Sequence, residues 1–154
     1  MARLKRERKR FMKKIIMLLI ATLAFSFSPA MGREKDVLKA LEKIRGRVKA
    51  GISYKEYCDL VADARVEIRF HMKSGEPNGC FVQAAEGCYK WYHLAKDSWG
   101  EKIETELQIC RFDWSHSPAE LKRMKKLLNE MENLKSNSWR HAQSELDKAY
   151  KCLK

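Results

Sequence analysis

The sequence predicts an all-α fold: an up-down antiparallel bundle of about four helices that includes a long C-terminal helical hairpin. Three observations support this prediction. Apolar residues after residue 33 recur three and four positions apart, which is the period of an amphipathic helix. Residues typical of helix starts and stops separate these segments. No stretch of alternating β-branched residues indicates a strand, and the short connections favour antiparallel neighbours.

The first two predicted helices are short. One runs from about residue 34 to residue 49 and ends at Gly51. One face of this helix carries Val37, Leu41, Ile44 and Val48. The next helix starts at Ser53, which forms a capping-box pattern with Glu56: the Ser53 hydroxyl accepts from the Glu56 amide, and the Glu56 carboxylate accepts from the Ser53 amide. Its apolar stripe ends near residue 72.

The third and fourth predicted helices form the long hairpin. The third spans about residues 80–110, with a kink or break expected at Gly100, because Gly weakens a helix by about 1 kcal/mol relative to Ala. Its heptad-like seam contains Phe81, Ala85, Cys88, Tyr92, Ala95 and Trp99. The fourth starts at Ser117 as N-cap, with Pro118 in the first turn and Glu120 as the third helical residue. We expect a hairpin of roughly 45–50 Å, with the shorter pair packed along one end.

Residues 1–32 have the three parts of a secretory signal peptide. A basic region precedes an uncharged apolar run of 13 residues, and small residues follow. Cleavage is expected after Ala30 or, alternatively, after Gly32, and Met12 is an alternative start of translation. Residues 33–154 then form a single helical domain. We therefore expect a periplasmic or secreted protein of the bacterial cell envelope.

Most of the net charge of +12 lies in this leader, which has eight basic residues and one acidic residue. The remaining charge is too small and too dispersed to indicate a nucleic-acid-binding surface. The apolar run is shorter than the roughly 20 residues that a membrane-spanning helix needs. An uncleaved N-terminal helix that tethers the protein to a membrane is the alternative to cleavage.

All five cysteines lie in the predicted mature domain, in a compartment where disulfides persist. Folding the hairpin at its turn places Cys80 beside Cys152, which is the first predicted disulfide. The second is Cys58–Cys88. Cys110 is then a free or intermolecular thiol, which suggests a disulfide-linked homodimer. The alternative pairing, Cys58–Cys110 with Cys80–Cys88, requires a loop between Cys80 and Cys88.

The aromatic residues offer a candidate binding surface. Trp114 lies with Phe112 and His116 around the predicted turn of the hairpin, where polar neighbours favour exposure. Loops of this kind carry function more often than helix interiors do. Tyr92 and Trp99 lie on the predicted buried stripe, so we expect them in the core.

No catalytic residue, cofactor or metal is predicted. The sequence contains no nucleophile elbow, zinc-protease motif, P-loop or dinucleotide fingerprint, and its cysteines lack C-x-x-C spacing. His93 and His141, facing each other across the hairpin, would form only a weak metal site. The main hypothesis is a non-enzymatic binding or scaffold protein whose partner is an unknown envelope protein or ligand. An enzyme with a site assembled from separated residues is the alternative.

Overall fold

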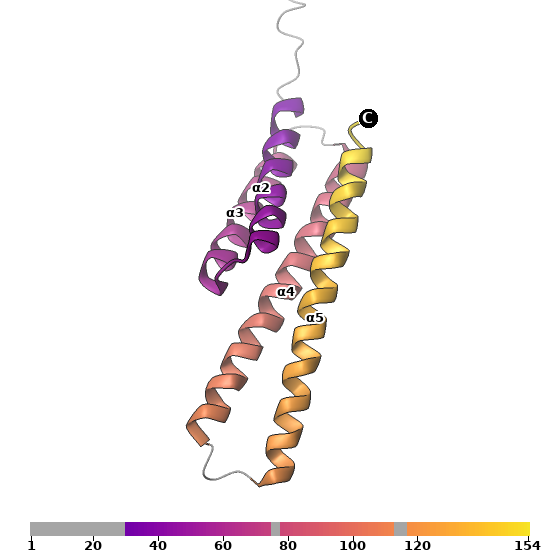
Figure 1. Cartoon of the computed structure of the whole chain (residues 1–154). Helices are drawn as coiled ribbons and strands as arrows, with labels where there is room; N and C mark the ends of the chain where they lie inside the picture. The colour runs from indigo at the N-terminus through magenta and orange to yellow at the C-terminus, as the bar shows by residue number, and fades with distance from the viewer. Residues whose placement is uncertain (1–29, 75–77, 113–116) are drawn as a thin grey trace, which may run out of the picture.

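The structure, a computed structural model, describes residues 30–74, 78–112 and 117–154. These ranges form four helices and no strand: α2 (Ala30–Ala50), α3 (Tyr54–Met72), α4 (Gly79–Phe112) and α5 (Pro118–Lys151). Successive helices run in opposite directions, and α4 and α5 form the long hairpin (Figure 1). The predicted all-α antiparallel bundle is therefore confirmed.

The predicted signal peptide lies outside the described residues, except for its last three. Ala30 to Gly32 form the first turn of α2, so this helix begins about four residues earlier than the apolar pattern predicts. Apart from that first turn, the four helices lie within residues 33–154, and the extent of the single domain stays a prediction.

α2 and α3 pack against only one end of the α4–α5 hairpin (Figure 1). α4 and α5 have 34 residues each, so the hairpin is about 50 Å long, whereas α2 has 21 residues and α3 has 19. Among the described side chains, no buried residue of α4 lies beyond Ser98 and none of α5 lies before Lys135. We call the four-helix end, up to Ser98 and from Lys135, the head. The two-helix remainder, residues 99–112 and 118–134, is the arm.

The apolar stripes of all four helices form the core of the head. The largest fully buried side chains include Tyr57, Tyr92, Phe81, Leu41, Ile44 and Leu146. Five of the six seam positions predicted on α4 are buried, and Trp99 packs against the cluster from a partly exposed position. Complete burial of one such side chain stabilises the fold by about 1.5–3 kcal/mol. Hydrophobic stabilisation is therefore concentrated in the head.

Both predicted N-caps are confirmed. The hydroxyls of Ser53 and Ser117 each accept from a backbone N–H three residues later, at 3.3 Å. At Ser117 the capping box is complete, because the Glu120 carboxylate accepts from the Ser117 N–H at 2.8 Å. At Ser53 the predicted complete box is wrong. The Glu56 carboxylate instead accepts from Nε of Arg47 at 2.7 Å, which ties the start of α3 to the end of α2.

Two glycines have different roles from one another. Gly51 has a φ of 84°, the left-handed conformation that ends α2 as predicted. A break at Gly100 is wrong, because α4 continues through this residue, while a kink there stays a prediction. A Cβ atom at Gly100 would lie 2.5 Å from the Tyr54 hydroxyl oxygen. Gly100 therefore allows the close approach of α3 to α4.

Candidate functional site

The binding surface predicted at the turn of the hairpin lies outside the described residues. Trp114 and His116 fall within residues 113–116, and Phe112 ends α4 with a side chain that is not described. Its role therefore stays a prediction. The described residues bring other groups together in the head and where the head meets the arm.

The predicted Cys80–Cys152 pair is present as a disulfide, with its Cα atoms 5.8 Å apart. It joins the start of α4 to the end of α5. Asn78 supports the same corner, because its Nδ2 donates to the Cys152 carbonyl at 3.0 Å and its Oδ1 accepts from the Cys80 N–H at 3.1 Å. The disulfide therefore joins α4 and α5 at the end of the hairpin opposite to their chain connection.

The second predicted bridge, Cys58–Cys88, is not formed, and both residues are thiols. Cys88 lies in the centre of the buried seam, and burial raises the pKa of its thiol. Cys58 follows the core residue Tyr57 and so lies at the edge of the stripe, where it is only partly buried. The prediction paired these residues only because they lie at a similar height along neighbouring helices. It did not consider that the two side chains point in different directions. Cys110 is an exposed free thiol on the arm, as predicted.

Four aromatic side chains pack together where the head meets the arm: Tyr54, Tyr57, Trp99 and Trp139. The centroids of contacting rings are 5.6, 5.7, 5.8 and 5.9 Å apart, mostly in edge-to-face geometry. The Tyr57 hydroxyl accepts from Nε1 of Trp139 at 3.0 Å and donates to the Tyr92 carbonyl at 2.9 Å. Burial raises the pKa of Tyr57, so its hydroxyl keeps its proton. This junction cluster stabilises the contact between α3, α4 and α5.

Lys135 covers the junction cluster with a positive charge. Its Nζ lies 4.9 Å from the ring centroid of Trp99 and 5.1 Å from that of Trp139, within the range of cation–π contacts. The Glu132 carboxylate accepts from both Lys135 and Lys102 at 2.8 Å. These hydrogen bonds lower the pKa of Glu132, and the Glu132 carboxylate raises the pKa of Lys102. The protein's own lysine therefore occupies the aromatic faces that a cationic ligand would contact.

The three described histidines each contact different residues. His93 pairs through Nδ1 with Asp97 at 3.0 Å, and His141 stacks on Trp91 with a centroid distance of 4.5 Å. His71 is buried against a phenylalanine ring, and neither of its ring nitrogens has a hydrogen-bond partner within the described ranges. No group of three or more potential metal ligands occurs in the part of the chain that the structure describes.

A pocket of about 230 Å³ lies between α2, α4 and α5 in the head. Its lining includes the aromatic residues Tyr92 and Trp139 and three basic residues, Arg45, Lys49 and Arg140. None of the described residues that line it is acidic. Sequence analysis missed this pocket because its residues come from three helices far apart in the sequence. Each basic residue taken alone has the pattern of a solvated helix face.

Of the described helices, none is both long enough and apolar enough to cross a membrane. Comparison with known proteins gives no match: no family model fits the chain, and no curated protein or solved structure is significantly similar to it.

Proposed function

We propose that the chain is an exported, non-enzymatic binding or scaffold protein of the cell envelope. In this proposal the disulfide-closed head is the rigid base, and the arm projects from it to contact another envelope protein. The observation that carries the proposal is the arm itself, a helical hairpin with no third element packed over it in the described part of the chain.

The proposal of export rests on the leader sequence and is supported by the disulfide. Disulfides such as Cys80–Cys152 persist in oxidising compartments and are rare in the cytosol. Cleavage after Ala30 or after Gly32 would remove only the first turn of α2. The core contacts of that helix begin at Val37, so either product keeps them.

The titration behaviour of the head favours binding over catalysis. The phenols of Tyr57 and Tyr92 and the thiol of Cys88 have raised pKa values because they are buried, so their neutral forms are stabilised. Glu132 is held ionised by its two lysine partners. Acid–base catalysis uses groups whose environments bring their pKa values near neutrality. The perturbed groups described here have structural explanations instead.

The arm exposes apolar surface that a partner can bury. Leu107, Leu127 and Leu134 are 52%, 47% and 43% exposed. Leu127 and Leu134 are seven residues apart and so share one face of α5. An amphipathic helix of a partner protein laid along this face would bury both side chains, contributing about 1 kcal/mol for each half-exposed leucine.

A pull-down from cross-linked native envelopes tests the arm. We compare the wild-type chain with the double variant Leu127→Lys/Leu134→Lys, and with Val66→Lys as control, because Val66 is 48% exposed on α3 of the head. The expected result is one protein captured by the wild type and the control and lost with the arm variant. Equal capture by all three chains, or recovery of lipid or glycan alone, would contradict the proposal.

The proposal includes a disulfide-linked homodimer through Cys110, whose thiol is exposed on the arm. Non-reducing electrophoresis of the native protein is expected to show a dimer that Cys110→Ser removes. The matched control Cys58→Ser should retain the dimer, because Cys58 is partly buried in the head. A monomer in all three samples would exclude this part of the proposal.

A further inference from the structure

We propose that the head binds a small organic anion, a carboxylate or phosphate group carried on a flat apolar body, in the pocket between α2, α4 and α5. This site is separate from the arm, and it does not depend on the partner proposed above. The proposal follows from the charges that line the pocket, from a tyrosine hydroxyl that is open to the pocket and has no partner among the described residues, and from an indole wall.

The pocket brings three cationic side chains together, and its lining, as far as the described residues form it, contains no acid. Lys49 on α2 and Arg140 on α5 have no ion-pair partner within the described ranges, and both are exposed. Arg45 is held by Glu42 and lies 3.8 Å from Asp147, which orients it beside the pocket. Lys49 and Arg140 are therefore the two charges at this pocket without an acidic partner, and a bound anion would compensate them.

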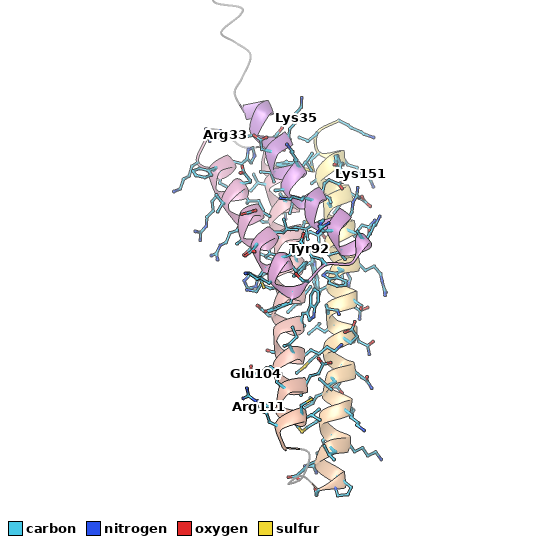
Figure 2. All side chains as sticks on the ribbon, turned by 60° about the vertical axis from the view of Figure 1, so that its left-hand side comes forward. Arg33, Lys35, Tyr92, Glu104, Arg111 and Lys151 are labelled. Atoms are coloured by element: carbon cyan, nitrogen blue, oxygen red, sulfur yellow. A yellow bond between two sulfur atoms is a disulfide. The ribbon has the colours of Figure 1, made fainter. Side chains whose placement is uncertain are left out.

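Tyr92 supplies a hydrogen-bond donor to the same pocket. The residue is only 1% exposed and lines the pocket. Its hydroxyl has no hydrogen-bond partner among the residues described, and it is not one of the fully enclosed polar atoms, so its oxygen is open to solvent in the pocket. The equally buried Tyr57 hydroxyl makes two hydrogen bonds, which is the usual state of a buried polar group. Figure 2 labels Tyr92 in the head, where the helices lie together. An unused donor beside cationic side chains fits an oxyanion as ligand.

The protonation state of Tyr92 supports its role as donor. Burial raises the pKa of this phenol, while the nearby Arg45 guanidinium opposes that effect. The phenol therefore keeps its proton at neutral pH and lies close to the cationic lining. A neutral hydroxyl donates to a carboxylate or phosphate oxygen in a charge-assisted hydrogen bond.

The remaining wall of the pocket is apolar. Trp139 is partly buried and lines the pocket, while its Nε1 is already bonded to Tyr57. The part of the Trp139 side chain that lines the pocket, on the surface that Lys135 does not cover, offers with Val48 an apolar wall for a flat group. The volume of about 230 Å³ is below the roughly 300–1,000 Å³ of pockets for drug-sized ligands, so a single ring with one anionic group is the expected size.

Nuclear magnetic resonance titration of the oxidised protein tests the proposal, with the Trp139 indole N–H as reporter. The probes are phenyl phosphate, benzoate, inorganic phosphate and the neutral analogue phenol. The expected result is saturable one-to-one binding of phenyl phosphate or benzoate, at least about tenfold tighter than that of phenol. Tighter binding of one of these probes identifies the preferred anionic group. Similar affinity for phenol, or shifts that do not saturate, would overturn the proposal.

Variants then locate the site. Tyr92→Phe should weaken binding of the preferred probe by roughly tenfold, since one hydrogen bond to a charged group is lost. Lys49→Ala/Arg140→Ala should abolish measurable binding. The control Arg123→Ala/Lys125→Ala removes the same charge from exposed positions on the arm and should bind as the wild type does. If the arm control lost as much affinity for the probe, binding would depend only on the net charge of the protein. The proposed site in the pocket would then be rejected.

Discussion

Replacing Tyr57 with Phe is expected to destabilise the protein, whereas the same replacement at Tyr92 is not. Both side chains are almost completely buried, and both substitutions remove one oxygen atom. The Tyr57 hydroxyl joins Nε1 of Trp139 to the Tyr92 carbonyl. No described residue is bonded to the Tyr92 hydroxyl. Comparing the two variants therefore separates the contribution of the buried hydrogen bonds to stability from that of burying the ring.

The structure sets the size of the two effects. In Tyr57→Phe the Trp139 N–H loses its acceptor inside the junction, and an unsatisfied buried donor costs about 1–3 kcal/mol. For a domain of this size that corresponds to a fall in Tm of about 4 °C for each kcal/mol. Tyr92→Phe leaves no protein group unpaired, so we expect a change within about 0.5 kcal/mol.

Urea unfolding followed by circular dichroism, with the disulfide intact, measures both variants. The expected result is a lower midpoint for Tyr57→Phe with an unchanged slope, and a wild-type curve for Tyr92→Phe. Equal losses at the two positions would refute the reasoning, since the Tyr92 hydroxyl would then have a structural partner and would not be free for a ligand.

Three further predictions concern the caps, the disulfide and alkaline pH. Ser117→Ala should lower the free energy of unfolding by about 1 kcal/mol. The loss should exceed that of Ser53→Ala, because only Ser117 has a complete capping box. Urea unfolding of both variants checks this order. Replacing Cys80 and Cys152 with Ser should cost about 4 kcal/mol, because the bridge closes a loop of 72 residues, and wild-type stability in the double variant would contradict this. Burial, followed by the hydrogen bond with Cys58, raises the pKa of Tyr54 from 10.0 to about 12. The contribution of the Tyr54 phenol to stability is therefore complete below pH 10 and is lost as the pH rises from 10 to 12. A urea midpoint that stays constant up to pH 12 would rule out this contribution.

The features that the sequence predicted correctly are local or follow from helix geometry. The N-caps at Ser53 and Ser117 depend on residues three positions apart, and the structure has both. The buried seam of α4 follows from its apolar period. The Cys80–Cys152 pair follows from folding two helices of similar length against each other, because that places their outer ends at one level.

The features that the sequence did not predict depend on contacts between helices. Cys58 and Cys88 lie on neighbouring helices, but one side chain lies at the edge of its stripe and the other in the core. α4 continues through Gly100, where the Tyr54 hydroxyl packs closely, and no local pattern reveals this contact. The basic pocket is likewise formed by helices that meet only in the folded protein.

The pattern of exposed leucines follows from the same geometry. The apolar stripe of a helix is buried when another helix packs over it. α2 and α3 are too short to cover the whole hairpin. The sequence predicted this unequal length but not which apolar residues stay exposed. Leu127 and Leu134 lie beside the seam that faces α4, so the hairpin itself does not bury them.

Intact-mass spectrometry of the native protein, after alkylation of free thiols in denaturant, tests the central claim of an exported, disulfide-bonded head most directly. The account predicts a chain that begins at Met31 or Arg33. It also predicts that Cys58 and Cys88 are alkylated before reduction, together with Cys110 in any chain that is not linked through it, and that Cys80 and Cys152 are alkylated only after reduction. A chain that retains residues 15–27, or one with all five cysteines alkylated before reduction, would contradict the account.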